Sequence, residues 1–380
     1  METEATRSTE YSTTEAVLYM AFELSNKKWK LGFTIGQAQE PRLRTIAAND
    51  LGALRWEIGQ AKKRFGLAAT APVRSCYEAG RQGFWLHRAL SADQIENLVV
   101  DSASIEVNRR RKRRKTDRLD VVKLVTMLLR YHHGERKVWS VVHVPSVEAE
   151  DGRQLHRELV ALKAERTQAI NRLKGLLASQ GVRLPVRQDF RARLERVRLW
   201  DGSALPPALR ARLEREYAQL QFIEDQIKEL ERMRAALVRE AEQPSVALVR
   251  QLLQLRGIGI ETAWQYVMEF FGWREFRNRR QVGALAGLNP TPYQSGDSSR
   301  EQGISKAGNR LVRRLAVESA WSWLRHQPDS ALSRWYEERF GQGGPRQRKI
   351  GLVALARQLL IALWRYLATG ELPEGALLKA

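Results

Sequence analysis

Strand-forming and helix-forming patterns occupy different parts of this 380-residue chain, and their separation limits the folds open to it. Runs rich in β-branched and aromatic residues alternate with helical spacing in the first third, whereas no strand signal appears from 150 to 240. The predicted strands are VLYMAFEL (17–24), WKLGFTI (29–35), RLRTIAA (42–48), PVRSCYEA (72–79) and ENLVVDSA (96–103), and the predicted helices are LGALRWEIGQAKKRFG (51–66) and GFWLHRAL (83–90). An opening hairpin, with its turn predicted at 25–28, followed by strand–helix alternation predicts a mixed sheet with helices on its faces, in the order of an α/β RNase H-like domain.

The segment from 150 to 240 is charged and alanine-rich, and its apolar residues recur at coiled-coil spacing. One seam is Leu155, Leu159, Leu162, Arg166, Ala169, Leu173 and Leu176, in which Arg166 is the one charged residue. The second stretch carries Leu213, Leu220 and Ile227 in one register and Ile223, Leu230 and Leu237 in another. Two long helices joined by a connection with Pro and Gly predict an antiparallel coiled-coil hairpin that serves as an arm or a dimerisation device. Helices packed within one globular bundle are the alternative.

From residue 246 onward the pattern is helical again, with loops predicted at 257–259, 287–304 and 341–348. The sequence LLQLRGIGIETAWQYVMEF is typical of a helix-hairpin-helix, in which Gly257 and Gly259 would let backbone amides approach a phosphate. An ordinary tight turn is the alternative. The predicted organisation is therefore a flexible tail at 1–14, a metal-binding domain at 15–145, an arm at 146–245 and an all-α domain at 246–380.

The charge balance predicts a polyanionic partner. The chain has 64 Lys and Arg against 43 Asp and Glu, a net charge of +21. No apolar run approaches the ~18 residues of a membrane span, and no signal peptide opens the chain. Both observations favour nucleic acid over a membrane as the partner, and they predict a cytoplasmic, nucleoid-associated protein. Cys76 is the single cysteine, which excludes internal disulfides and thiolate zinc clusters.

Seven consecutive cations precede a predicted helix. If about five of them neutralise phosphates, affinity should fall roughly 500-fold between about 50 and 200 mM salt. Thr116 is the expected N-cap of the helix TDRLDVVKLVTMLLRYHH, whose apolar face is predicted to include Leu119, Val122, Val125 and Leu129. The seven cations, all predicted to bind nucleic acid, are Arg109, Arg110, Arg111, Lys112, Arg113, Arg114 and Lys115.

Four carboxylates are candidates for one divalent-metal site. Glu23 lies on the first predicted strand and Glu78 ends a later one, while Asp117 and Asp120 share one side of the first turn of the following helix. Oxygen-only ligands suit Mg²⁺ or Mn²⁺, and four acids could hold two ions at ~3.5 to 4 Å. The alternative is structural: Glu78 as a strand end, and the aspartates as partners of the helix N-terminus and the cation run.

Ser295 is the candidate nucleophile, in a loop rich in Pro, Gly and Ser. The following helix is predicted to begin with a cationic anion-binding end, against which a serine hydroxyl could attack phosphorus. Composition alone leaves Ser295 as a turn residue. The predicted nucleic-acid-binding cations of that helix are Lys306, Arg310, Arg313 and Arg314.

The motifs CYEAG, DSASIEVNRRRKRRKTDRLD and GLNPTPYQSGDSSREQGISKAGN, in that order, resemble the bridge-RNA-guided DEDD transposases of bacterial insertion sequences. The resemblance covers nearly the whole chain. It implies a RuvC-like N-terminal domain, a coiled coil and a C-terminal transposase domain with a serine-recombinase-like step. It also implies that Glu23, Glu78, Asp117 and Asp120 hold the metal and that Ser295 forms a phosphoserine link to DNA. A homo-oligomer, dimer or tetramer, would act on donor and target DNA with a structured guide RNA supplying sequence choice.

The first acid departs from the family pattern, because Glu23 stands in Glu-Leu-Ser where the family commonly has Asp-Val-Ser. The extra methylene moves the carboxylate outward by about 1.5 Å. Ser298 and Ser299 compete with Ser295 for the role of nucleophile, and Ser295 is preferred because Gly296 follows it. Two other functions stay open: a junction resolvase or nuclease that uses metal-activated water alone, and a non-catalytic nucleic-acid-binding protein.

Overall fold

A computed structural model describes residues 16–36, 39–105, 117–295 and 298–379 of the chain. Its contacts divide the protein into two compact units, one ending at Val144 and the other beginning at Pro145. The arm and the C-terminal helices belong to the same unit.

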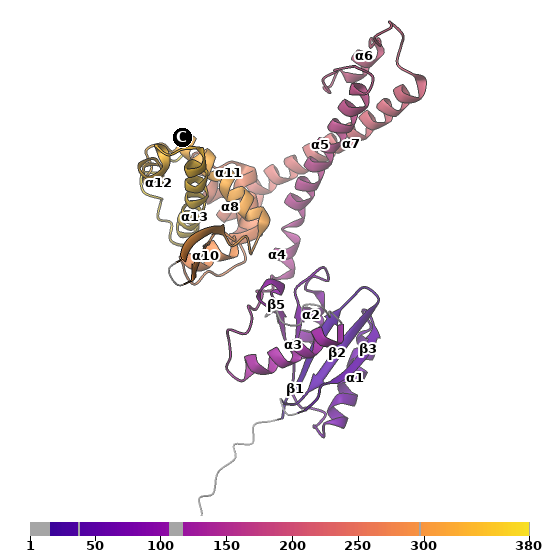
Figure 1. Cartoon of the computed structure of the whole chain (residues 1–380), viewed down its shortest axis with the longest axis vertical. Helices are drawn as coiled ribbons and strands as arrows, with labels where there is room; N and C mark the ends of the chain where they lie inside the picture. Colours follow the sequence, from indigo (N-terminus) through magenta and orange to yellow (C-terminus); the bar gives the residue numbers. More distant parts are fainter. Residues whose placement is uncertain (1–15, 37–38, 106–116, 296–297, 380) are drawn as a thin grey trace, which may run out of the picture. The chain divides into compact units, whose positions relative to one another are not determined.

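The first unit is built on a five-stranded mixed sheet in the order β3-β2-β1-β4-β5 (Figure 1). β1 pairs antiparallel with β2 and parallel with β4, as an opening hairpin followed by strand–helix–strand connections requires. The strands are β1 (Leu18–Leu24), β2 (Lys28–Thr34), β3 (Arg42–Ala47), β4 (Val73–Glu78) and β5 (Glu96–Val100), followed by the short 3-10 helix η1 (Ser102–Ser104). The predicted mixed sheet is confirmed.

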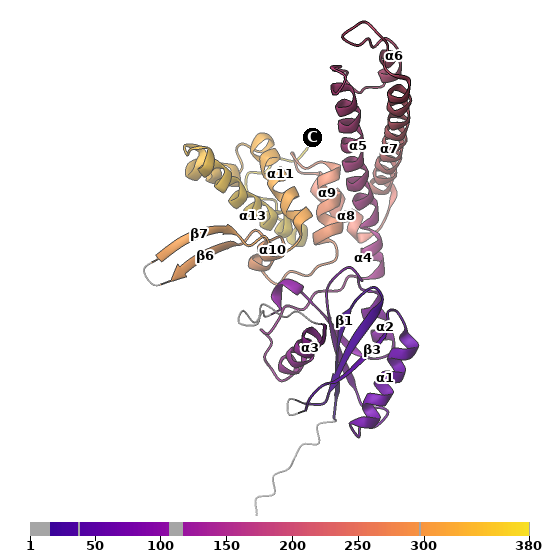
Figure 2. The ribbon, with the colours of Figure 1, turned by 45° about the vertical axis from the view of Figure 1, so that its right-hand side comes forward.

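Helices cover both faces of this sheet (Figure 2). Residues such as Met20 and Phe22 pack with α1 (Leu51–Arg64) and α2 (Trp85–Ala92), and the alternate residues Tyr19 and Ala21 pack with α3 (Asp117–His132). Side chains on a strand point alternately to the two faces, so each strand supplies both layers.

The predicted apolar face of α3 is partly wrong. Val121 and Leu124 are buried against the sheet, whereas Leu119 is 43% exposed. The apolar residues of α3 occur around almost its whole circumference, so their spacing alone was compatible with more than one buried face.

The arm begins with α4 (Val147–Asp151) and consists mainly of α5 (Gln154–Ala178) and α7 (Pro207–Glu240), with α6 (Phe190–Glu195) between them. Leu159 and Leu162 near the start of α5 pack with Ile223 and Ile227, while Leu173 further along packs with residues near the start of α7. The pairing is therefore antiparallel, as predicted, and Figure 2 shows the two helices side by side. Knobs-into-holes packing, which would define a coiled coil, stays a prediction.

The remaining helices pack around α13 (Pro345–Thr369), which contributes nine buried residues. By length and composition α13 is also the one described helix apolar enough to cross a membrane, yet half of its apolar stretch lies inside this core. The other elements are α8 (Pro244–Leu253), α9 (Ile260–Tyr266), the π-helix η3 (Val267–Phe271), α10 (Arg279–Leu285), β6 (Pro290–Ser295), β7 (Ser298–Ile304), α11 (Arg310–His326), α12 (Ala331–Tyr336) and the π-helix η4 (Glu337–Gly341).

The expectation of an all-α domain is corrected by the hairpin β6–β7, which occupies the segment predicted as a loop. Proline is excluded from central strands because it cannot donate to the ladder, but a two-stranded ribbon has only edge strands. Pro290 and Pro292 are therefore tolerated in β6, with an irregularity of register between them.

Candidate functional site

Glu23 and Glu78 lie at the carboxyl ends of two adjacent parallel strands. The β1–β4 register ends with Phe22 opposite Tyr77, so the two glutamates are the next residues on each strand. They share the sheet face of Ala21 and Cys76, because side chains two positions apart point the same way. That is the face covered by α3.

α3 runs antiparallel to β1, which brings its first turn toward the same strand ends. Near its start, Val121 packs so closely on β2 that a Cβ added to Gly32 would lie 3.3 Å from Val121 Cγ2. At its end, the ring of His132 lies 5.8 Å, centroid to centroid, from that of Tyr19 near the start of β1. Asp117 and Asp120, in the first turn, therefore lie at the end of the sheet that carries Glu23 and Glu78.

The four candidate ligands are carboxylates, the donor type that a hard cation prefers. The described side chains nevertheless do not form a complete metal site. Glu23 and Asp120 are half-buried and Glu78 is exposed. The Asp117 side chain lies outside the described residues, and no three acid, histidine or cysteine side chains among those described gather closely enough to hold an ion. Binding of Mg²⁺ or Mn²⁺ stays a prediction that rests on backbone convergence and carboxylate chemistry.

Sequence reasoning missed two features of this sheet end. Lys30 on β2 is the register partner of Glu23, which puts a cation beside the candidate acids. Arg81 donates a hydrogen bond to the Asn26 side chain and so ties together the loops that follow Glu78 and Glu23. The hairpin turn at 25–28 already implied the pairing of Lys30, but a contact between side chains 55 positions apart leaves no local pattern.

Ser295 is exposed at the last position of β6, opposite Ser298 in the hairpin register. The pairing leaves residues 296 and 297 as the connection, and both lie outside the described residues. The candidate nucleophile is thus presented at the closed end of a β-ribbon and not in a loop. Figure 2 shows this ribbon extending from the helices of its unit.

The open end of the ribbon is fixed by backbone hydrogen bonds between the chain segment that enters it, 285–289, and the segment that leaves it, 305–309. We call these two segments the ribbon root. Ser305 N donates to Asn289 O at 2.9 Å and Asn309 N donates to Leu285 O at 2.9 Å. Gly308, at φ +122°, comes so close that a Cβ there would lie 2.3 Å from Leu285 O. Only glycine permits this approach.

A buried carboxylate joins this root to the arm. Glu269, in the π-helix η3, has a side chain only 3% exposed. It bonds with His156 Nε2 at 2.8 Å and accepts from Arg157 Nε at 2.6 Å, both on α5, and from Asn309 Nδ2 at 3.2 Å. Asn309 also caps α11 through its side-chain oxygen. One side chain therefore connects the arm helix α5 to the residue that closes the ribbon root.

These contacts depress the pKa of Glu269. Burial works to raise it, but the hydrogen bonds from His156 and Arg157 and the Arg157 charge outweigh burial and lower the pKa to about 2. The carboxylate is therefore charged at any physiological pH. Sequence analysis did not single out Glu269, because a lone acid within a helical pattern carries no signal of burial.

The predicted cations near the ribbon have different roles. Arg313 donates to Ala286 O and Lys306 O at 3.2 and 3.0 Å, so it bonds to both segments of the ribbon root. Arg314 lies 3.5 Å from Glu318. Lys306 and Arg310 are exposed and form no ion pair among the described residues.

The turn at 257–259 is packed against the protein itself. Gly257, at φ +84°, would place a Cβ 3.2 Å from His326 Cβ, and its carbonyl accepts from Ser322. Gly259 has open space on its Cβ side. The close approach of Gly257 thus serves contact with α11, and a helix-hairpin-helix that binds phosphate stays a prediction. The cation run 109–115 and Thr116 lie outside the described residues.

Known proteins similar to this chain are transposases. A model of the transposase IS116/IS110/IS902 family matches residues 249–335, which include the ribbon. A Sinorhizobium fredii protein named as transposase y4rJ is 43% identical over 379 residues, 95% of this chain and 94% of its own. A Pseudomonas aeruginosa protein named as a family 20 transposase is 31% identical over 60% of this chain and 66% of its own. The Yersinia enterocolitica transposase for insertion sequence element IS1328 is 29% identical over 55% and 60%.

A mixed sheet with acids at its strand ends, a basic helical unit and these relatives define the protein class as a transposase, an enzyme that cuts DNA and transfers its strands. The chain belongs to the IS116/IS110/IS902 family of insertion-sequence transposases.

Proposed function

We propose that this transposase cuts and rejoins DNA through a covalent phosphoserine link formed by Ser295. The observation that carries the proposal is the exposed position of Ser295 at the closed end of an anchored β-ribbon, inside the segment matched by the family. A hydroxyl at the end of a ribbon could approach a DNA backbone more closely than a hydroxyl on a flat helical surface.

The proposed step exchanges one phosphate ester bond for another. Ser295 Oγ forms a bond to phosphorus and gives up its proton to solvent. The P–O bond to the departing strand breaks, and its electron pair goes to the departing oxygen, which takes up a proton. The ester keeps the bond energy of the phosphodiester. Attack by the hydroxyl of another strand reverses the step and completes the transfer.

Glu23, Glu78, Asp117 and Asp120 would hold a divalent cation at the strand ends described above. When bound, the cation offsets the charge of the scissile phosphate. The carboxylates would orient the ion, and Lys30, the register partner of Glu23, would reduce the repulsion between the acids and an approaching phosphate.

A structured RNA is proposed as the source of sequence choice, which the resemblance to bridge-RNA-guided transposases supports. Base pairing would select donor and target while the basic surface of the protein holds backbones. Sequencing of RNA that co-purifies with the protein tests this directly. A structured transcript of the flanking element is expected, and its absence from active preparations would refute guidance.

A denaturing gel tests the covalent step. Labelled DNA from an element end should give a protease-sensitive adduct with the wild type and Mg²⁺, and none with Ser295→Ala. Ser298→Ala and Ser299→Ala are the matched controls and should retain the adduct. Glu78→Gln, isosteric and at an exposed position, should lose it through weaker metal binding. Strand cleavage without an adduct would favour the resolvase alternative.

A further inference from the structure

The outer end of the arm, residues 174–215, is rich in arginine. It carries nine arginines and one lysine against four carboxylates. We call these residues the arm tip. Arginine is the cation best suited to phosphate and to stacking on aromatic rings, because its planar guanidinium is always charged.

All four carboxylates of the arm tip already have partners. Asp189 accepts from Arg193 at 2.6 Å, Glu195 and Glu214 both lie within 4.0 Å of Arg210, and Asp201 accepts from Ser203. Three exposed arginines, Arg183, Arg187 and Arg196, form no ion pair among the described residues. The excess positive charge of the tip is therefore directed to solvent.

Trp200 is 93% exposed at the apex of a closed turn in this tip. Leu199 N donates to Ser203 O at 2.8 Å across the turn, and Asp201 accepts from both Ser203 N and Ser203 Oγ. The neighbouring side chains of Val197 and Leu199 pack into the apolar cluster between α5 and α7. The indole is thus held outward by a braced turn whose other apolar residues point inward.

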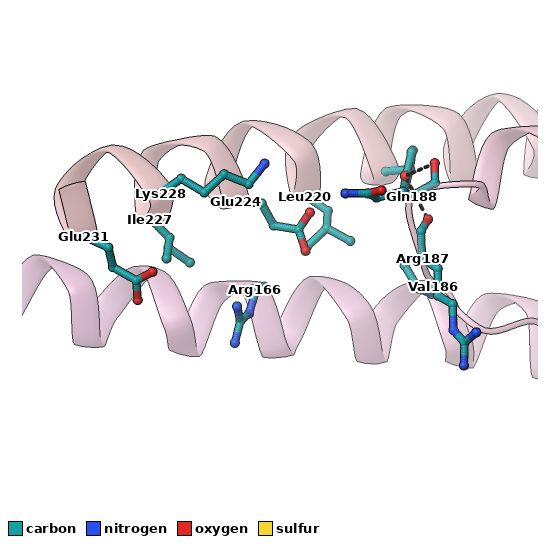
Figure 3. A pocket seen from close by; sticks show the side chains of 10 residues that line it. Arg166, Val186, Arg187, Gln188, Leu220, Glu224, Ile227, Lys228 and Glu231 are labelled. Atoms are coloured by element: carbon teal, nitrogen blue, oxygen red, sulfur yellow. Dashed lines mark hydrogen bonds between the residues drawn. The ribbon is translucent and has the colours of Figure 1, made fainter. Parts of the chain in front are cut away.

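Two hollows on the arm also combine apolar walls with arginine. One, of about 370 Å³, is lined by Ala178, Val182, Leu184 and Pro185 together with Lys174 and Arg183. The other, of about 410 Å³, lies between the arm helices and is lined by Arg166 of α5, Ile227 and Glu231 of α7, and Arg187 (Figure 3). Each hollow thus places a flat cation beside an apolar wall.

We propose that the arm tip binds an unpaired segment of nucleic acid, with a base stacked on Trp200 and phosphates paired with Arg183, Arg187 and Arg196. A duplex hides its base faces, so an exposed indole contributes most with a single strand. A second copy of the tip is a poorer occupant, because a two-fold contact would set the same positive excess against itself. The inference deepens the proposed function by naming a site for its polynucleotide partner.

The test compares binding of oligouridylate, oligothymidylate and a duplex by the full chain. Trp200→Ala should weaken binding of the single strands roughly 5- to 150-fold, the value of one stacked base, and Trp200→Phe should restore most of it. Duplex binding should change little. Trp56→Ala is the matched control, because Trp56 is 61% exposed on α1 of the other unit. Preference for RNA or DNA distinguishes a guide from a displaced DNA strand.

The charge contribution has its own readout. Replacing Arg183, Arg187 and Arg196 with alanine should lower the slope of log affinity against log salt by about 2, at ~0.7 per phosphate lost. Trp200→Ala should leave this slope unchanged. If Trp200→Ala binds the single strands within two-fold of the wild-type affinity, the proposal is overturned. A change in the oligomeric state of Trp200→Ala without a change in its single-strand affinity would overturn it as well. Ser295→Ala should bind normally, so the proposed chemistry can fail without affecting this result.

Discussion

Glu269→Gln should remove a pH-dependent part of the stability of the unit that begins at Pro145. The folded pKa of Glu269 is about 2 against an ordinary value of 4.5. At about 1.36 kcal/mol per pKa unit, the ionised carboxylate contributes about 3 kcal/mol. Because the folded pKa is depressed, this contribution is fully present above pH 4.5 and is lost as pH falls toward 2.

The assay is urea unfolding of the full chain followed by far-ultraviolet circular dichroism, in which the helices of this unit dominate. At pH 7 the free energy of unfolding of Glu269→Gln should lie about 3 kcal/mol below that of the wild type. The difference should shrink as pH falls from about 5 and nearly vanish close to pH 2. The neutral amide keeps the shape of the acid, so the comparison isolates its charge.

Glu318→Gln is the matched control, since Glu318 lies in the same unit but its ion pair with Arg314 is more than half exposed. Its substitution should cost about 0.5 kcal/mol or less at every pH. A gap between the wild type and Glu269→Gln that is independent of pH would refute the reasoning, because the loss would then come from shape and not from ionisation.

Three further predictions concern packing. Leu173→Ala, at a fully buried position of the arm, should lower the free energy of unfolding by about 2–5 kcal/mol, measured by thermal or urea melting; an unchanged midpoint would contradict the observed α5–α7 packing. Gly308→Ala should reduce adduct formation far more than duplex binding, because its Cβ would meet Leu285 O at 2.3 Å and displace the ribbon root; equal losses in both assays would argue against a positioning role. Cys76 should resist a thiol reagent until the chain unfolds, because burial raises the pKa of its thiol and excludes the reagent; rapid reaction in the native protein would show that the sheet face under α3 is open.

Local patterns predicted much of the first unit. The hairpin turn at 25–28 and the alternating apolar residues of the strands specify the sheet, because one face of each strand must be buried against a helix. The face that α3 buries was not predictable from this segment alone. Several of its faces are apolar, and the structure packs Val121 against Gly32 while Leu119 stays exposed.

The serine ribbon and the Glu269 cluster show where local pattern fails. Pro290, Pro292 and the surrounding polar residues have the composition of a loop, and their pairing depends on tertiary fixation at Asn289 and Ser305. Glu269 is stabilised by partners 112, 113 and 40 positions away, and such contacts leave no periodic trace. Motifs singled out Ser295 and the four acids, and both their roles and their assembly into one site stay predictions.

Mass spectrometry of the protein–DNA adduct is the most direct test of the central claim. After Mg²⁺-dependent reaction and digestion, we predict a nucleotide bonded to the peptide that contains Ser295, at that residue and not at Ser298 or Ser299. Attachment at a different residue, or cleaved DNA with no attached peptide at all, would contradict the account.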